Sequence, residues 1–126
     1  MIVGLGVDLV SVERISGVWQ RHGERFLSHI LTPGERQQFA REAPSIRFLA
    51  KRFAVKEAFS KALGMGMRSP VQWNAIGTGH DDLGAPQVIL EEPLKSFVQT
   101  RGIDHIWVSV SDEKTHAMAC VVLEGA

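Results

Sequence analysis

Apolar positions follow two different periods along this chain, and they divide it into elements. Residues 2–10 alternate as a strand does. One face of this predicted strand carries Val3, Leu5, Val7 and Leu9, and the other carries Ile2, Gly4, Gly6, Asp8 and Val10. Glycines beside an acid on one face indicate the close approach of another element or of a ligand.

Helix-start signals predict three helices in the first half of the chain. Ser11 is a plausible N-cap for a helix that runs to about His22. The segment 32–35 reads Thr-Pro-Gly-Glu, a capping box with proline at the first helical position, and predicts a helix to about Arg41. Ser45 predicts the start of a longer helix that ends at Gly64.

The second half of the chain is predicted to be rich in strands. Residues 72–79 and 86–90 flank the turn HDDLGA and indicate a hairpin, and residues 92–100 form a helix. Residues 105–111 and 116–123 are expected to be strands around a polar turn at 112–115. Helices early, strands late and one strand at the start predict an α+β fold, with an antiparallel sheet packed against the long helix. With 126 residues, we expect a single domain over residues 1–126.

The long predicted helix, RFLAKRFAVKEAFSKALGMG, places a carboxylate among apolar residues. At about 100° per residue it has two apolar stripes, so most of it should be buried. The first stripe is Ile46, Ala50, Phe53 and Glu57, and the second is Phe48, Val55, Phe59 and Ala62. Burying an unpaired carboxylate costs several kcal/mol. Glu57 is therefore expected to pair with a cation, bind a metal or take up a proton.

Asp8 is the other acid in unusual surroundings, on the glycine face of the first strand. Two converging carboxylates suit a hard divalent cation that keeps some of its waters, most naturally Mg²⁺ completed by phosphates of a substrate. The structural alternative is that Glu57 pairs with Lys61, four residues later, and that Asp8 caps a neighbouring helix.

Basic residues on the long helix suggest a polyphosphate. Arg52, Lys56 and Lys61 are spaced by four and five residues, and Gly64 and Gly66 follow them. Arginine can grip phosphate by its fork and lysine as a point charge. A solvated basic face with a glycine C-cap explains the same residues equally well. The order KALGMG is not a P-loop, because the lysine precedes the glycines.

A second basic stripe lies on the first predicted helix. Arg14, Val18, Arg21 and, if the helix continues, Arg25 share one face. Positive charge around an apolar centre would fit an acidic amphipathic helix of a partner, although an ordinary exposed face would show the same pattern.

The charges are unevenly distributed along the chain. Residues 1–68 hold eleven Lys/Arg against six Asp/Glu, and residues 69–126 hold three against eight. The basic half could thus receive an acidic partner or a polyphosphate.

Composition excludes several classes of protein. Apolar residues make up 44% and charged residues 22%, and no run reaches the ~18–20 apolar residues of a membrane span. The single cysteine, Cys120, allows no intrachain disulfide and fits a cytoplasmic location. The five histidines have no zinc-site spacing. Basic residues do not alternate with aromatic ones, so nucleic-acid binding is not expected.

Five segments together resemble the holo-[acyl-carrier-protein] synthases, the small bacterial 4′-phosphopantetheinyl transferases. They are GLGVDLVSVERI, FLSHILTPGE, RFLAKRFAVKEAFSKALGMG, DDLGAP and WVSVSDEKTHAMACVVLE. The resemblance covers nearly the whole chain. It departs from the common pattern at Met65, Trp107 and Asp112.

The resemblance implies Mg²⁺-dependent transfer of the phosphopantetheine arm from coenzyme A to a serine of apo-acyl carrier protein, in support of fatty acid biosynthesis. The residues it matches are Asp8 and Glu57 as metal ligands, Lys61 beside the pyrophosphate, Arg52 near the coenzyme A phosphates, and Arg14, Arg21 and Arg25 at the carrier-docking face. It also implies a homotrimer with its sites at subunit interfaces. Two other classes stay open from the residues alone: a non-catalytic coenzyme A-binding module and a metal-dependent pyrophosphate hydrolase.

Overall fold

The computed structural model describes residues 1–41 and 45–126. Its elements in chain order are β1 (Ile2–Ser11), α1 (Val12–His22), α2 (Glu24–Ile30), α3 (Pro33–Arg41), α4 (Ile46–Leu63), the 3₁₀ turn η1 (Trp73–Ala75), β2 (Ile76–His80), β3 (Pro86–Leu90), α5 (Leu94–Thr100), β4 (Ile103–Asp112) and β5 (His116–Gly125). Helices precede most of the strands, so the predicted α+β class is confirmed.

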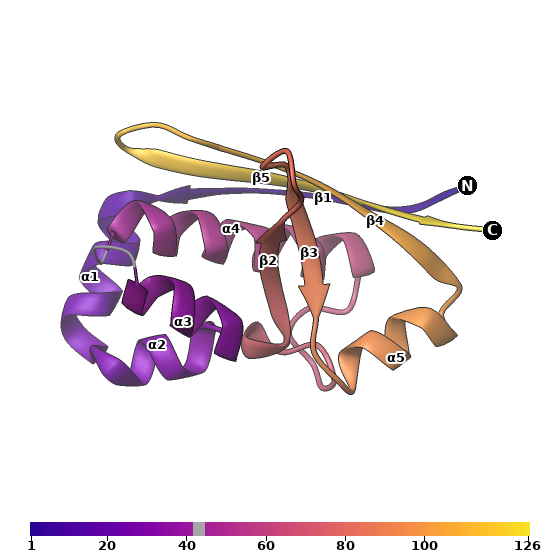
Figure 1. Ribbon diagram of the computed structural model, residues 1–126, viewed down its shortest axis with the longest axis horizontal. Helices are drawn as coiled ribbons and strands as arrows, with labels where there is room; N and C mark the ends of the chain where they lie inside the picture. Colours follow the sequence, from indigo (N-terminus) through magenta and orange to yellow (C-terminus); the bar gives the residue numbers. More distant parts are fainter. Residues whose placement is uncertain (42–44) are drawn as a thin grey trace.

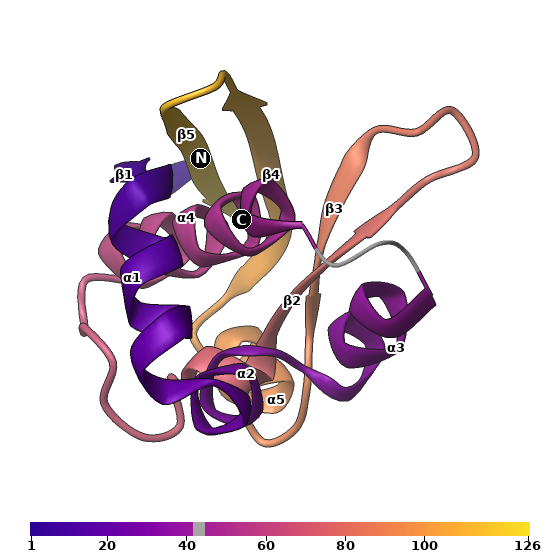
Figure 2. The same cartoon turned by 90° about the vertical axis from the view of Figure 1, so that its left-hand side faces the viewer.

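An antiparallel sheet with the strand order β1-β5-β4 covers one side of the long helix α4 (Figure 1). A separate hairpin, β2–β3, crosses the other side of α4, and β3 packs beside β4. Figure 2 shows α3 next to this hairpin, on the opposite side of the molecule from α1 and β1. Both chain ends lie at one end of the sheet, where the Met1 amino group donates to the carbonyl oxygen of Gly125.

The glycine face of β1 is what lets α4 approach the sheet closely. A β-carbon at Gly6 would lie 2.0 Å from the carbonyl oxygen of Ala58, and one at Gly4 would lie 2.2 Å from that of Ala62. No real side chain fits at such distances, so these positions require glycine. The predicted close approach on this face is confirmed, and the approaching element is α4.

The predicted caps are confirmed. The Ser11 hydroxyl accepts from the Arg14 amide, and the Ser45 hydroxyl accepts from the Phe48 amide. The capping box also forms, because Thr32 and Glu35 each accept the other's backbone N–H at 3.1 Å. The long helix ends at Gly64, whose φ of 78° is left-handed.

One boundary differs from the prediction, and one helix was not predicted. The first helix ends at His22 as predicted and does not continue to Arg25, because Gly23 turns the chain at φ 51° into α2. The short helix α2 was not predicted. The strand expected over residues 72–79 begins only at Ile76, because residues 73–75 form the 3₁₀ turn η1.

The sheet has one covered face and one open face. Side chains that point toward α4, such as Val10, Ala119 and Val121, are buried. The open face carries large exposed apolar side chains from all three strands, which we call the open sheet face. They are Val3, Leu5, Val7 and Leu9 of β1, Trp107 of β4 and Met118 of β5. A contiguous apolar surface of this kind marks an interaction site.

Candidate active site

Asp8 and Lys61 meet where β1 crosses the last turns of α4. The Nζ atom of Lys61 lies 3.1 Å from Asp8 Oδ1 and donates to the carbonyl oxygen of Val7, also at 3.1 Å. The side chain of Lys61 is half exposed, whereas that of Asp8 is mostly covered. Lys61 can therefore still reach a ligand in solvent while it neutralises Asp8.

Glu57 lies on α4 one turn before Lys61 and faces the same region. Partial burial raises the pKa of its carboxyl group, and the nearby charge of Asp8 raises this pKa further. Lys61 and Arg14 oppose the rise. Glu57 is therefore held close to a second carboxylate in surroundings that disfavour its own charge.

The alternative in which Glu57 and Lys61 form the ion pair is not what the structure holds. Lys61 bonds Asp8, which is 53 positions away in sequence. Among the described residues, no ion pair joins Lys61 to Glu57. Two carboxylates thus share one lysine, and this group (Asp8, Glu57 and Lys61) we call the edge cluster. Arg14 of α1 is a further cation near this cluster, close enough to lower the pKa of Glu57.

The donor set of the edge cluster suits a hard cation. Two carboxylates held close together repel each other, and a divalent ion that binds both relieves this repulsion. Within residues 1–41 and 45–126, no group of three or more acidic, histidine or cysteine side chains is placed to hold a metal by itself. A cation here would have two protein carboxylates and would complete its shell with water and phosphate oxygens, as Mg²⁺ does.

Lys56 and Arg52 do not lie with Lys61, in contrast to the predicted basic stripe. Lys56 is fully buried, with Nζ 2.6 Å from Glu35 Oε1 and also donating to the carbonyl oxygen of Ile76. Arg52 is buried too, with Nε 3.8 Å from Glu35 Oε2 and its guanidinium over the Phe48 ring. Burial lowers the pKa of Lys56, against the opposing effect of Glu35. The expectation that Lys56 contacts a ligand phosphate is therefore corrected to a structural ion pair.

The geometry of the helix explains this sorting of charges. Residues 52 and 56 are four apart and share one side of α4, whereas residue 61 is five beyond Lys56 and points about 140° away. The first side faces α3 and β2, and the second faces β1. Regular spacing by four and five therefore places the three cations on two different sides of the helix.

The two glycines after α4 are exposed. Gly64 and Gly66 have φ values of 78° and 68°, in the left-handed region that favours glycine. Their backbone lies at the end of the helix that carries Lys61. A backbone role toward a ligand stays a prediction for both residues.

The predicted basic stripe on α1 is exposed but spans two helices. Arg14 and Arg21 lie on α1, whereas Arg25 lies on α2, and all three side chains are exposed. Arg14 is near enough to Glu57 to lower its pKa. The stripe therefore begins beside the edge cluster and leads away from it along α1.

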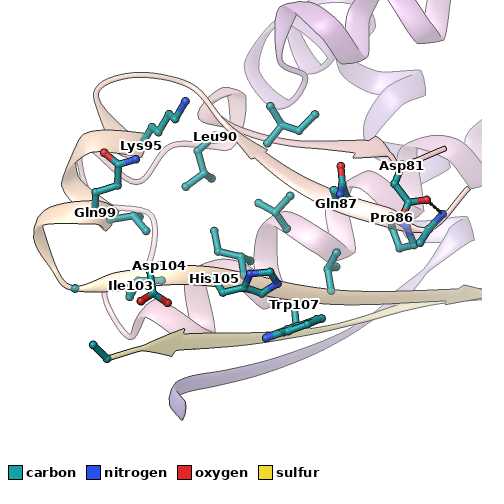
Figure 3. Close-up of a pocket in the computed structure, with 18 residues that line it drawn as sticks. Asp81, Pro86, Gln87, Leu90, Lys95, Gln99, Ile103, Asp104, His105 and Trp107 are labelled. Carbon is teal, nitrogen blue, oxygen red and sulfur yellow. Dashed lines mark hydrogen bonds between the residues drawn. The ribbon is translucent and has the colours of Figure 1, made fainter. Parts of the chain in front are cut away.

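A groove of about 930 Å³ lies between β3 and β4 and is closed at one end by α5 (Figure 3). Its only lysine or arginine is Lys95, set against Asp81 and Asp104, with an exposed histidine, His105, on β4. This balance of charge does not suit a diphosphate, so we do not assign the groove to one. A smaller depression on α1, of about 490 Å³, is lined by Arg14 and Arg21 among others. Neither hollow includes a residue of the edge cluster.

Comparisons with known proteins give the family. Residues 4–121 match the model of the 4′-phosphopantetheinyl transferase superfamily. A holo-[acyl-carrier-protein] synthase of Laribacter hongkongensis is 48% identical over 125 residues, which cover 99% of this chain and all of the relative. The chain therefore belongs to the 4′-phosphopantetheinyl transferase superfamily, as its motifs predicted.

Solved structures agree with this assignment. The crystal structure of the holo-[acyl-carrier-protein] synthase from Neisseria meningitidis superimposes with a TM-score of 0.95 at 42% identity, over 98% of this chain and 99% of that one. The enzyme from Bacillus anthracis, solved in complex with CoA (3′,5′-ADP), has a TM-score of 0.82 at 34% identity, over 100% and 99% of the two chains. The predicted fold, an antiparallel sheet on a long helix, is confirmed.

Sequence reasoning missed two charged contacts. Glu35 was expected only as a capping residue, yet it also holds Lys56 and lies near Arg52. Asp112, where the chain departs from the family pattern, bonds Arg47 at 2.9 Å and ties the end of β4 to the start of α4. The first contact had a signal, since two cations four residues apart on a buried helix need a nearby acid.

In the described part of the chain, no helix is both long and apolar enough to cross a bilayer.

Proposed function

We propose that this protein transfers the 4′-phosphopantetheine group from coenzyme A to a serine of apo-acyl carrier protein and releases adenosine 3′,5′-bisphosphate. The observation that carries the proposal is the edge cluster, a pair of close carboxylates with an exposed lysine, in a chain that matches the transferase superfamily over residues 4–121. The product would serve fatty acid biosynthesis in the cytoplasm.

Asp8 and Glu57 are the proposed ligands of Mg²⁺. A bound Mg²⁺ would neutralise charge on the diphosphate of coenzyme A and so favour displacement at phosphorus. The raised pKa of Glu57 supports this role, because a carboxylate held near another one gains most from a cation. Lys61, half exposed beside Asp8, is placed to offset the charge that develops on the leaving phosphate.

The remaining steps are the docking of the carrier protein and the attack by its serine. The carrier serine attacks the β-phosphorus of coenzyme A: an O–P bond forms, the hydroxyl proton of the serine passes to water, and the bond to the bisphosphate breaks. Because Arg14 lies near Glu57, a carrier helix docked on Arg14, Arg21 and Arg25 would bring its serine to the edge cluster. Gly64 and Gly66, at the end of α4, are proposed to approach the cofactor through their backbone. The placement of Arg52 near the coenzyme A phosphates stays a prediction; its side chain is buried, with Nε 3.8 Å from Glu35 Oε2.

We further propose that the chain works as a homotrimer, with coenzyme A between two subunits. The edge cluster lies beside β1, an outer strand of the sheet, where Lys61 is half exposed, so a second chain has room to approach it. The open sheet face is apolar and exposed, as expected of a surface that a second copy covers. A head-to-tail ring would set another chain's surface opposite the edge cluster.

One mass measurement tests the reaction. The protein is incubated with apo-acyl carrier protein, coenzyme A and Mg²⁺, and the intact mass of the carrier is then measured. A gain of one phosphopantetheine group supports the proposal. Coenzyme A cleaved without transfer would indicate the pyrophosphate hydrolase, and coenzyme A bound but unchanged would indicate the binding module; either result overturns the proposal.

The trimer has its own test. Sedimentation equilibrium of the parent protein should give three times the chain mass, and Leu5→Asp on the open sheet face should give monomers that lack transferase activity. Glu91→Gln, a neutral change on the connection between β3 and α5, serves as the control. A monomeric parent protein with full activity would rule out a site shared between two subunits.

A further inference from the structure

The carboxylate of Glu35 joins three elements in the interior of the protein. It is 2% exposed, and it accepts from the backbone N–H of Thr32 at 3.1 Å and of Thr78 at 3.2 Å. It also accepts from Lys56 Nζ at 2.6 Å. The Lys56 ammonium itself donates to the carbonyl oxygen of Ile76. We call Glu35 and Lys56, with these three backbone groups, the Glu35 hub.

The Glu35 hub is more directional than a hydrophobic contact would be. Its hydrogen bonds attach the start of α3, the middle of α4 and the strand β2 to one another at fixed distances. A buried ion pair adds little net stability compared with apolar side chains of similar size, because both charges must be desolvated. What such a pair can supply is a specific orientation of the elements it joins.

The orientation concerned is the rotation of α4 about its own axis. Lys56 has both of its acceptors on the α3 and β2 side of the helix, and Glu57 is the next residue along α4. A rotation of α4 that freed Lys56 would therefore also turn Glu57. On the opposite side, Gly6 of β1 touches the backbone of Ala58, so α4 is held between the hub and the strand that carries Asp8.

We propose that the Glu35–Lys56 pair is a positioning pair, which sets the rotation of α4 so that Glu57 faces Asp8. The identity of the ligand that the two carboxylates hold, a divalent cation, rests on the proposed function. Lys56 acts through Glu57 and touches no substrate in this arrangement. This role differs from the direct phosphate contact that the sequence predicted for Lys56.

The decisive variant is the apolar double substitution Glu35→Leu with Lys56→Met. It removes the Glu35–Lys56 charges together, but it also takes the acceptor from the buried amides of Thr32 and Thr78, so the melting temperature should fall by several degrees while the fold survives. The directional bonds are lost, however, so α4 should turn. Metal-free crystal structures of parent and double variant should show a greater separation of the Asp8 and Glu57 carboxylates in the variant.

Cation binding supplies the second measurement. Binding of Mn²⁺ alone, followed by the electron paramagnetic resonance signal of the free ion, should weaken about tenfold or more in the double variant. Asp112→Asn is the matched control, because it breaks an exposed ion pair between α4 and β4 and leaves the hub intact. It should bind Mn²⁺ as the parent does.

The outcomes separate the two proposals. An unchanged carboxylate separation in the double variant overturns the positioning role, whatever the cation does. Unchanged Mn²⁺ affinity beside a changed separation also overturns it, since the orientation would then have no consequence for the ligand. A parent protein that binds no Mn²⁺, with a variant whose carboxylates have moved apart, overturns the metal site of the proposed function and leaves the positioning of Glu57 standing.

Discussion

Two lysines on α4 each bond a carboxylate, but one pair is buried and the other is open to solvent. Lys56 and Glu35 are both almost completely buried, and the carboxylate also accepts backbone N–H groups. Lys61 is half exposed, and its partner Asp8 lies close to a second acid, Glu57. The charges of the first group lie away from solvent. The second group holds two acids close together and is open to solvent, so a cation can reach it and would relieve the repulsion between the acids.

An ion pair with a lysine therefore does not by itself identify a functional acid. Glu35 is the more deeply buried of the two glutamates, yet its carboxylate already accepts from Lys56 and from two backbone N–H groups. Glu57 is less buried, and its partial burial together with the neighbouring Asp8 makes its charge unfavourable. Two close acids within reach of solvent distinguish a binding site from a buried structural ion pair.

The largest expected effect comes from removing the charges of the edge cluster. Glu57→Gln and Asp8→Asn should each lower kcat/KM about a hundredfold or more, because each removes a proposed ligand of the cation. Steady-state kinetics at saturating Mg²⁺ would measure this, with circular dichroism to show that the fold survives. A variant that kept the parental rate would place the cation elsewhere.

Breaking the buried pair from one side should instead lower stability. Lys56→Met leaves a charged Glu35 in the interior and should reduce the free energy of unfolding by about 3–5 kcal/mol. Urea denaturation measures this, and Asp112→Asn, which breaks an exposed pair, should cost less than about 1 kcal/mol. Equal losses of unfolding free energy in the two variants would contradict the distinction between the buried Lys56–Glu35 pair and the exposed Arg47–Asp112 pair.

The contact that brings β1 to α4 can be broken without touching a charge. Gly6→Ala places a β-carbon against the carbonyl oxygen of Ala58, so it should cost about 1–3 kcal/mol of stability and lower activity by shifting Asp8. Thermal unfolding and kinetics of the same preparation would show both effects. Gly34→Ala on α3, where a β-carbon meets little, is the control. A Gly6→Ala protein with parental stability and activity would contradict the close packing.

Charge reversal on the docking stripe should separate the two substrates. Arg21→Glu should raise KM for the carrier protein about tenfold, the equivalent of about 1.4 kcal/mol, and leave KM for coenzyme A nearly unchanged. Arg14→Glu should affect both, because Arg14 also acts on Glu57. Lys95→Glu, an exposed change on α5, controls for net charge. Equal effects of Arg21→Glu on both substrates would refute a separate docking face.

The smallest effect is a gain in stability. The folded state raises the pKa of Glu57 above its unfolded value, so folded metal-free protein binds the proton more tightly, and stability falls as pH rises through this range. Glu57→Gln should therefore raise the Tm of the metal-free protein at neutral pH. The difference should vanish at about pH 3, where the carboxyl is protonated in both states. A lower Tm for Glu57→Gln at neutral pH would show that its charge stabilises the fold.

Local signals in the sequence determined much of this protein. Side-chain oxygens at Ser11 and Ser45 and the Thr32–Glu35 capping box predict helix starts, because unpaired amides at a helix start need acceptors within a few residues. The alternation of β1 predicts both its glycine face and its apolar face. Asp8 and Glu57 stand out because each is an acid in apolar or glycine-rich surroundings.

Only the tertiary structure decided which cation meets which acid. Lys61 bonds Asp8, 53 positions away, and Lys56 bonds Glu35, 21 positions away. Helical periodicity shows that Lys56 and Lys61 point to different sides of α4, but it does not say which side faces β1 and which faces α3. That choice depends on how α4 packs against the glycines of β1, a contact between segments more than fifty residues apart. Charge pairing over such separations is a property of packing, and local sequence does not contain it.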